Sequence, residues 1–372
     1  YLLDAGNPTP YTMITSLLGT SFIGFTRSAG TKPCGRVLNP ATGENLEPEY
    51  VSATPEEVER TMALASSAFP VYSNLPGKTR AEFLRAIAGE IEAVTEDIVE
   101  RGQLENALSE SRLRSETART TGHCRMFADL IEEGSWVDAR IDRGDPDRQP
   151  KPMPDLRSML RPLGPVAVFC ATNFPIAYSV AGGDSAAALA AGCPVIVIAN
   201  DAHLGVAEIV AAAVIRAAQK CGMPDGVLSL LYGGGREVGQ AVVKHPATQA
   251  VGFTGSRAGG TALMDIAAKR PQPIPVYAEM SSINPIVILP GGLERDEDAL
   301  AEAFFHSVTD GVGQFCTDPG LVFLPEGKGE GFLEKLKQLI EDSSPGVMLT
   351  GEISKSYDEA TAAVASADGV ET

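Results

Sequence analysis

The most constraining feature of this sequence is a regular alternation of apolar runs and helix-like segments between residues 164 and 278. The apolar runs are rich in β-branched residues and are predicted as buried strands. They are Val166–Cys170, Val195–Ile198, Val227–Leu231, Ala250–Phe253 and Ile274–Tyr277. The segments between them, 178–191, 204–220, 235–244 and 256–269, are predicted as helices. Strands that alternate with helices indicate a parallel sheet with both faces covered, so we expect an α/β fold.

The flanking regions have a different character. Residues 1–50 are predicted as loops and short strands, and Thr54 to Glu57 form a capping box that opens a helix ending near Phe69. Further helices are predicted over 78–106, 111–133 and 294–311, and from Lys355 onward. The stretch 134–162 is predicted as a protruding hairpin, because two short apolar segments flank a turn rich in Pro and Asp.

Charge and cysteine use narrow the class of protein. The chain has 30 Lys and Arg against 48 Asp and Glu, and its net charge of −18 argues against bare nucleic acid or anionic lipid as partners. The six cysteines show no C-x2-C pairing and only four histidines are present, so no metal site is expected. We expect a reduced, intracellular chain.

Two features favour a cytoplasmic location without a membrane span. No Lys or Arg precedes Arg27, so the segment Tyr1–Phe25 lacks the charged region of a signal peptide. The longest weakly polar run, Ala186–Ala199, is interrupted by Gly192 and Pro194 and is too short to cross a bilayer.

The residues that follow the predicted strands are the candidates for function, because ligands bind at the carboxyl ends of parallel strands. Gly255–Gly260 follows a strand and opens a helix, which suits a pyrophosphate but equally suits a tight turn. Asn173 could donate to an oxyanion or serve as a turn residue. Glu279 could be a general base or an ion-paired carboxylate.

Cysteine and histidine residues give weaker signals by themselves. Cys316 follows a glycine-rich approach and precedes Thr317-Asp318-Pro319-Gly320, so it could be an activated thiolate, although a lone cysteine is more often a small core residue. The four histidines, His123, His203, His245 and His306, show no metal or triad spacing, and we expect them at the surface or at helix ends.

Taken in order, these segments resemble the aldehyde dehydrogenase superfamily. The motifs that carry the resemblance are Thr172-Asn173-Phe174-Pro175, Phe253–Gly260, the Glu279-Met-Ser-Ser-x-Asn-Pro segment and Gly313–Gly320. The amino-acid sequences of these motifs are similar to those of the α-ketoglutarate semialdehyde (2,5-dioxopentanoate) dehydrogenases and their NADP-dependent fatty-aldehyde relatives. The resemblance runs from about Met13 to about Pro325.

The resemblance implies an NAD(P)-dependent oxidation of a small aldehyde. Cys316 would attack the aldehyde carbon, Asn173 and the Cys316 amide would stabilise the oxyanion of the thiohemiacetal, and Glu279 would activate the water that hydrolyses the thioester. It further implies a Rossmann-like cofactor-binding domain over 1–133 and 163–278, an oligomerisation hairpin over 134–162, and an α/β catalytic domain over 279–372. A homodimer or homotetramer is expected.

The resemblance also points to cofactor-binding positions. These are Thr172, Ile198, Asp201, Arg236, Gly255, Ser256 and Gly260. Family members usually have Lys at the position of Ile198, where it binds the adenosine ribose or its 2′-phosphate. Asp201 favours NAD, because an acidic residue accepts the ribose hydroxyls and repels a 2′-phosphate, although it could instead cap a helix. Arg236 could still hold a phosphate, so NAD and NADP both remain open.

Other departures from the family pattern support an alternative. Ser281 replaces a Gly near the nicotinamide site, and the chain lacks the Glu-x-Phe-Gly-Pro segment that holds the nicotinamide ribose, so the catalytic domain is expected to be incomplete. The alternative is a non-catalytic structural or regulatory relative. An acidic substrate would need a cationic anchor, and Arg119, Arg125 and Arg161 are equal candidates from the sequence.

Overall fold

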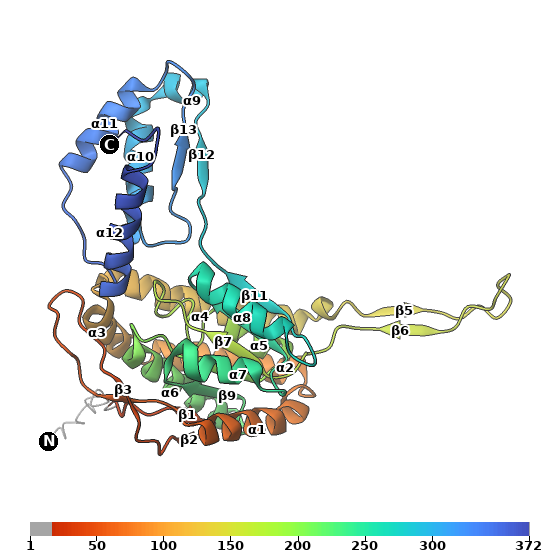
Figure 1. The fold of residues 1–372 in the computed structure, drawn as a ribbon. Coiled ribbons are helices and arrows are strands. Elements are labelled where there is room, and N and C mark those ends of the chain that lie inside the picture. The colour runs from red at the N-terminus through yellow and green to blue at the C-terminus, as the bar shows by residue number, and fades with distance from the viewer. Residues whose placement is uncertain (1–16, 372) are drawn as a thin grey trace, which may run out of the picture.

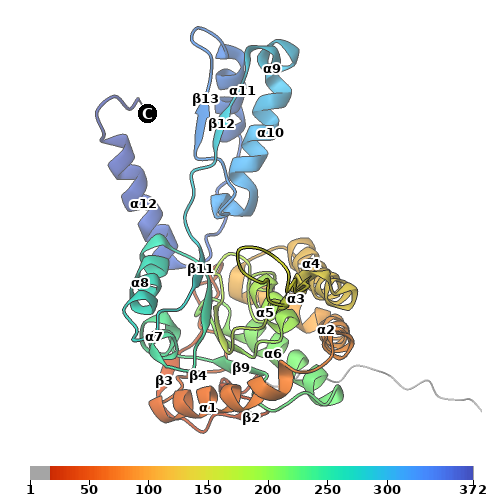
Figure 2. The ribbon, with the colours of Figure 1, turned by 90° about the vertical axis from the view of Figure 1, so that its right-hand side faces the viewer.

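The structure, a computed structural model, describes residues 17–371. Figures 1 and 2 show a large body built around one sheet and a smaller unit made by the C-terminal part of the chain. Figure 1 also shows a long hairpin that projects from the body. The beginning of the chain up to Ser16, which includes most of the segment examined for a signal peptide, lies outside the described residues.

The large sheet has seven strands in the order β11-β10-β7-β8-β9-β1-β2. Strands β7 to β11 are mutually parallel, and β1 and β2 continue one edge as antiparallel strands. The strands are β1 (Phe22–Ile23), β2 (Thr26–Arg27), β7 (Val166–Phe169), β8 (Val195–Ile198), β9 (Leu228–Leu231), β10 (Ala250–Thr254) and β11 (Val276–Glu279). The predicted α/β fold with a parallel sheet is therefore confirmed.

The fifth predicted strand is displaced by two residues. We expected Ile274–Tyr277, but β11 begins at Val276, directly after Pro275. Proline has no backbone N–H and cannot donate within a ladder, whereas its carbonyl accepts from the Val251 amide at 3.1 Å. As a result, Glu279 is the last residue of the strand and pairs in register with Thr254.

Helices cover both faces of this sheet. They are α1 (Pro55–Tyr72), α2 (Gly77–Glu92), α3 (Thr95–Asn106), α4 (Glu110–Glu133), α5 (Gly183–Ala191), α6 (Leu204–Lys220), α7 (Gln240–Lys244) and α8 (Arg257–Ala268), with a single π-helical turn, η2 (Gly234–Gly239), before α7. The predicted capping box of α1 is confirmed, since Thr54 and Glu57 each accept the other's backbone amide.

The predicted continuous helix over 78–106 is wrong. The structure has two helices, α2 and α3, separated at Ala93 and Val94. The Thr95 hydroxyl donates to the Glu92 carbonyl at 2.9 Å and closes the end of α2. Because β-branched residues are weak helix formers, two of them in succession, Val94 and Thr95, are a local reason for the break.

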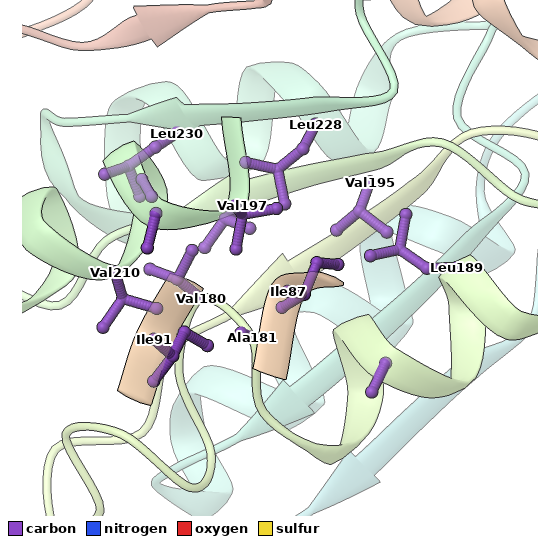
Figure 3. Packing of buried hydrophobic residues seen from close by; sticks show 14 of the residues in the cluster. Ile87, Ile91, Val180, Ala181, Leu189, Val195, Val197, Val210, Leu228 and Leu230 are labelled. Atoms are coloured by element: carbon purple, nitrogen blue, oxygen red, sulfur yellow. The ribbon is translucent and has the colours of Figure 1, made fainter. Parts of the chain in front are cut away.

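The core has two layers, one on each face of the sheet. Alternate side chains of β8 point to opposite faces of the sheet. Val195 and Val197 belong to one hydrophobic cluster, and Ile196 and Ile198 belong to the other. Figure 3 shows the first layer, where side chains of α2, α5 and α6 pack on β8 and β9. The second layer is closed by α1, α7 and α8. Continuous apolar strands thus reflect burial of both faces, as the sequence predicts.

The smaller unit has a two-stranded parallel sheet packed on helices. Its elements are β12 (Pro285–Val287), α9 (Pro290–Arg295), α10 (Glu297–Thr309), β13 (Leu321–Phe323) and α11 (Glu330–Glu341). We predicted one helix over 294–311, but Asp296 divides it, because its side chain accepts the Ala299 amide at 3.0 Å and caps α10. The last helix, α12 (Gly351–Ala365), begins beside the large body and extends away from it in Figure 2.

The predicted hairpin is present. Strands β5 (Arg140–Asp142) and β6 (Leu156–Ser158) pair as antiparallel strands, and every residue of both is exposed. A short antiparallel ribbon, β3 (Pro33–Gly35) and β4 (Tyr50–Val51), lies near the other edge of the body. No helix in the described part of the chain is long and apolar enough to cross a membrane.

A buried carboxylate joins α3 to the start of α6. Glu105 is fully buried, forms an ion pair with Arg101 at 2.8 Å, and accepts the amides of Gly205 at 2.8 Å and Val206 at 3.0 Å. A Cβ at Gly205 would lie 2.4 Å from Arg101 Nε and 2.6 Å from the Glu105 carboxylate, so a larger residue would displace this ion pair. This contact satisfies amides that a helix N-terminus otherwise leaves unpaired.

We predict that Glu105→Ala lowers the free energy of unfolding by about 3–5 kcal/mol, because Arg101 and two amides lose their buried partner. Urea unfolding followed by far-UV circular dichroism measures the change. Glu100→Ala on the same helix, at an exposed position, is the control and should change stability by less than about 0.5 kcal/mol. Equal effects of the two substitutions would contradict the capping role.

Candidate active site

Cys316 lies on a loop whose backbone is bound by side chains of the segment directly before β12. The turn η3 (Asp310–Gly313) leads into it with three consecutive positive φ angles at Gly311, Val312 and Gly313. The Cys316 carbonyl accepts from the Asn284 side-chain amide at 2.8 Å and from the Ser282 hydroxyl. The thiol is free, and the residue is half-buried. A half-buried, free thiol on a fixed backbone has the accessibility that a nucleophile needs.

Asn173 meets this loop directly. It follows β7, and its Nδ2 donates to the carbonyl oxygen of Gln314 at 2.8 Å, two residues before Cys316. The carboxamide nitrogen carries two hydrogens, so one remains to donate elsewhere. The structure thereby brings the Asn173 side chain to the loop that carries Cys316, from a segment far apart in the chain.

Glu279 lies at the same end of the sheet but does not touch the other two. Its backbone carbonyl accepts the Gly255 amide at 3.0 Å, which anchors the strand end, and its side chain is exposed. Within residues 17–371 its carboxylate forms no hydrogen bond or ion pair, so it is free to act on a water. Its catalytic role stays a prediction.

A large cleft of about 1200 Å³ runs along the carboxyl ends of the parallel strands. The predicted residues that line it are Thr172, Ile198, Asp201, Gly255 and Ser256. Ser256 caps α8 by accepting the Gly259 amide at 3.2 Å, so the N-terminus of α8 opens onto the cleft. Glycine and a helix N-terminus at a strand end form a cradle suited to phosphate oxygens.

Two predicted cofactor residues lie elsewhere. Arg236 is exposed on the π-helical turn and is not part of the cleft wall. Gly260 is buried behind the cleft, where a Cβ would lie 2.5 Å from the Met280 sulfur. Gly260 is therefore explained by helix–strand packing, which is one of the two interpretations that the sequence allowed for this turn.

The comparisons with known proteins agree with this geometry. The aldehyde dehydrogenase family signature matches residues 25–354. The chain belongs to the aldehyde dehydrogenase family. It is 49% identical over 356 residues to alpha-ketoglutaric semialdehyde dehydrogenase 2 of Azospirillum brasilense, covering 95% of this chain and 68% of that protein. It is 39% identical to the alpha-ketoglutaric semialdehyde dehydrogenase of Acinetobacter baylyi, covering 94% of this chain and 66% of that protein.

A solved structure supports the fold. The NAD-dependent benzaldehyde dehydrogenase of Corynebacterium glutamicum superposes with a TM-score of 0.80 at 22% identity, over 97% of this chain and 76% of that one. The chain spans about two thirds of the length of the two curated relatives. The predicted family and fold class are therefore confirmed.

In this aldehyde dehydrogenase the cleft carries two acidic side chains. Asp201 follows β8, and Glu352 comes from α12 on the opposite wall. Burial raises the pKa of Asp201, and the Glu352 carboxylate raises it further. Two neighbouring carboxylates of like charge make this part of the cleft unfavourable for a further anion.

His203 supports the Asn173 loop, a role that sequence reasoning missed. The prediction of a helix-terminal position is confirmed, since His203 directly precedes α6, but the alternative of a surface position is wrong because the residue is fully buried. Its Nε2 contacts the Ala171 carbonyl oxygen at 2.7 Å, two residues before Asn173. Burial lowers its pKa. A charged ring would leave a buried Nδ1–H without a partner.

Asn284 is the other missed residue. Its side chain bonds the carbonyl oxygens of Cys316 and, at 3.0 Å, Asp318. The signal was present in the sequence, because Asn284 belongs to the Glu-Met-Ser-Ser-x-Asn-Pro segment that carries the family resemblance. Its left-handed backbone, with φ of 48°, suits Asn among non-glycine residues.

We predict that stability falls as the pH decreases below about 6.5, the ordinary histidine pKa, because the unfolded chain then protonates His203 while the folded protein does not. The loss continues until the pH reaches the lower pKa of the folded state. His203→Gln, which can still donate to Ala171, should reduce this pH dependence, whereas His306→Gln at an exposed position should not. Urea midpoints at pH 7.5 and 5.5 measure the difference. The same change in midpoint between the two pH values for wild type, His203→Gln and His306→Gln would contradict the prediction.

Proposed function

We propose that this chain carries the NAD(P)-dependent oxidation of a small aldehyde to its acid, with α-ketoglutarate semialdehyde as substrate and 2-oxoglutarate as product. The observation that carries the proposal is the 2.8 Å contact between Asn173 Nδ2 and the Gln314 carbonyl, which places an amide donor beside the Cys316 loop. The substrate class follows from the 49% and 39% identical relatives, whose names specify that semialdehyde.

In the proposed mechanism the Cys316 thiolate adds to the aldehyde carbon and forms a thiohemiacetal. The remaining Asn173 N–H and the Cys316 amide donate to the developing oxyanion. NAD or NADP, when bound in the cleft, would supply the hydride acceptor that converts the thiohemiacetal on Cys316 to a thioester. Glu279 then takes a proton from water, the hydroxide adds to the thioester carbon, and the Cys316 thiolate leaves as the acid is released.

The cleft fits a dinucleotide. It begins at Thr172 near Asn173, passes the strand ends of β8 and β9, and reaches the glycine-rich start of α8. Asp201 would accept the adenosine ribose hydroxyls, and the α8 N-terminus would bind the pyrophosphate. Ile198 is buried in the core, so it supplies apolar wall where relatives of this family use a lysine.

Arg119 is the best placed of the three candidate anchors for an acidic substrate. It lies on α4 and its guanidinium donates to the Tyr178 hydroxyl at 2.9 Å, while Tyr178 packs edge-on against Phe174, the neighbour of Asn173. In contrast, both terminal nitrogens of Arg125 bind Glu92, and Arg161 contacts Asn74 beside the hairpin. Within the described residues Arg119 has no carboxylate partner, so its charge is available to a substrate carboxylate.

A cytoplasmic homodimer or homotetramer completes the proposal. The hairpin supports assembly, because its exposed strands carry Ile141 and Leu156 at 62% and 54% exposure. An isolated two-stranded ribbon is marginally stable in water, and pairing with another subunit would cover this apolar surface.

We predict that Cys316→Ala abolishes formation of reduced cofactor by this protein. Absorbance at 340 nm measures it, with a panel of carboxylate-bearing and neutral aldehydes and with NAD or NADP. Cys34→Ala, at an exposed cysteine outside the cleft, should leave activity unchanged.

Glu279→Gln should keep the pre-steady-state burst but lower steady-state turnover by about 100-fold or more. A folded wild-type protein without turnover and without cofactor binding would favour the non-catalytic alternative.

We predict a preference for NAD that depends on Asp201. Because the acidic cleft repels a 2′-phosphate, Asp201→Asn should lower the KM for NADP relative to NAD by about tenfold, which corresponds to ~1.4 kcal/mol. Asp265→Asn, at an exposed position on α8, is the matched control. A KM ratio that is the same in wild type and Asp201→Asn would rule out the electrostatic explanation.

A further inference from the structure

Arg112 lies where the Asn173 loop meets the Cys316 loop. Its guanidinium carbon is 4.4 Å from the ring centroid of Phe174 and also 4.4 Å from that of Phe315. The two rings are 5.1 Å apart and tilted by 30°. Phe174 directly follows Asn173, and Phe315 directly precedes Cys316. A single cation therefore contacts the immediate neighbours of both residues that the mechanism brings together.

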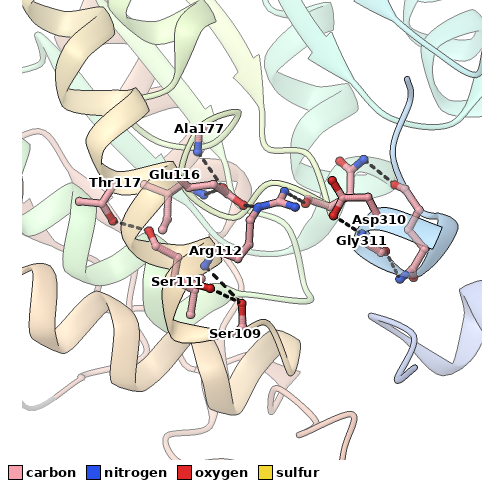
Figure 4. Close-up of polar contacts among 12 residues, drawn as sticks. Ser109, Ser111, Arg112, Glu116, Thr117, Ala177, Asp310 and Gly311 are labelled. Atoms are coloured by element: carbon pink, nitrogen blue, oxygen red, sulfur yellow. Dashed lines mark hydrogen bonds and ion pairs between the residues drawn. The ribbon is translucent and has the colours of Figure 1, made fainter. Parts of the chain in front are cut away.

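Glu116 holds this guanidinium in place. One carboxylate oxygen binds Arg112 Nε at 2.8 Å, and the other accepts the amides of Ile176 at 3.3 Å and Ala177 at 3.2 Å. Arg112 also donates to the Asn173 carbonyl at 3.4 Å. Figure 4 shows these contacts, with Ala177 beside Glu116 and the Asp310–Gly311 turn beyond Arg112. The side chains are 19% and 3% exposed, so solvent competes little with them.

Arginine is suited to this position in a way that lysine is not. The planar guanidinium stacks on aromatic rings while its nitrogens donate in fixed directions, so it can meet Phe174, Phe315 and Glu116 at once. A lysine ammonium is a compact charge that would keep the attraction to Glu116 but lose the stacking. The residue thus links the loop after β7 to the loop of the smaller unit by shape as well as by charge.

We infer that Arg112 is a positioning residue of the proposed reaction, one that sets the Asn173 amide relative to Cys316 through Phe174 and Phe315. This inference rests on the proposed function. Arg112 acts on the two loops and not on the substrate, so its loss should slow the step that develops an oxyanion. The binding of aldehyde and cofactor should be nearly unchanged.

The test is a rapid-mixing measurement of the burst of reduced cofactor in the full-length protein. Because loss of one oxyanion donor costs about 10²–10³ in rate, partial misplacement in Arg112→Lys should slow the burst by about 10- to 100-fold, with little change in KM. Arg114→Lys is the matched control, since Arg114 lies on the same helix, is exposed, and pairs with Glu96 and Glu110. It should leave the burst unchanged.

Two further readouts separate positioning from a general structural defect. In an Asn173→Ala background, Arg112→Lys should slow the burst by no more than about twofold, because the group that it positions is already gone. Alkylation of Cys316 by iodoacetamide develops no oxyanion, so its rate should also change by no more than about twofold in Arg112→Lys. Peptide mass mapping, with Cys316→Ala as the blank, assigns the alkylated thiol.

Each result decides the inference. A wild-type rate in Arg112→Lys, additive effects with Asn173→Ala, or an equal loss of burst and alkylation would overturn it. If Arg112→Lys does not fold, Glu116→Gln, which keeps the shape of the carboxylate but removes its charge, replaces it with the same expected results. A wild-type protein without a burst would overturn the proposed function and the inference together, whereas a wild-type burst with an unaffected variant overturns the inference alone.

Discussion

The parallel sheet is the constraint on which the rest of this structure depends. Its central strands are apolar on both faces, so helices must cover each side of the sheet. Between two parallel strands, the chain must return from the carboxyl end of one strand to the amino end of the next. Because all five parallel strands point the same way, their carboxyl ends lie at the same end of the sheet. The loops that leave this end of the sheet carry Thr172, Asp201 and Ser256, so the parallel topology assembles the cleft.

The proposed active site forms where this end of the sheet meets the smaller unit. Neither the large body nor the smaller unit carries both residues of the proposed site, since Asn173 comes from the large sheet and Cys316 from a loop beside β13. The contacts between the Asn173 and Cys316 loops include a hydrogen bond to Gln314, a pair of phenylalanine rings and the Arg112 guanidinium that contacts both rings. Buried polar groups that bridge loops in this way are costly to leave unpaired, which explains why Glu116 and His203 are held by backbone groups of the same loop.

Sequence reasoning was most accurate where periodicity is strong. The strand β8 and the helix α6 have the predicted limits, and β7, β9 and α8 differ by one residue at their ends. It failed where a local contact interrupts a periodic segment, as at Thr95 and Asp296, because the apolar spacing continues across the break. The catalytic candidates came from family motifs, whereas the support by His203 and Arg112 could not be read from spacing.

The sequence by itself determined the order of strands and helices, the α/β class and membership of the aldehyde dehydrogenase family. These follow from local composition, from periodicity and from motifs whose order is written in the chain. The tertiary structure alone decided that Arg119 bonds Tyr178 while Arg125 pairs with Glu92, that Glu105 caps α6, that Gly260 packs on Met280, and that Arg112 joins the two loops. Such contacts join residues far apart in sequence, and their existence depends on how the covered sheet brings loops together rather than on any pattern within one segment.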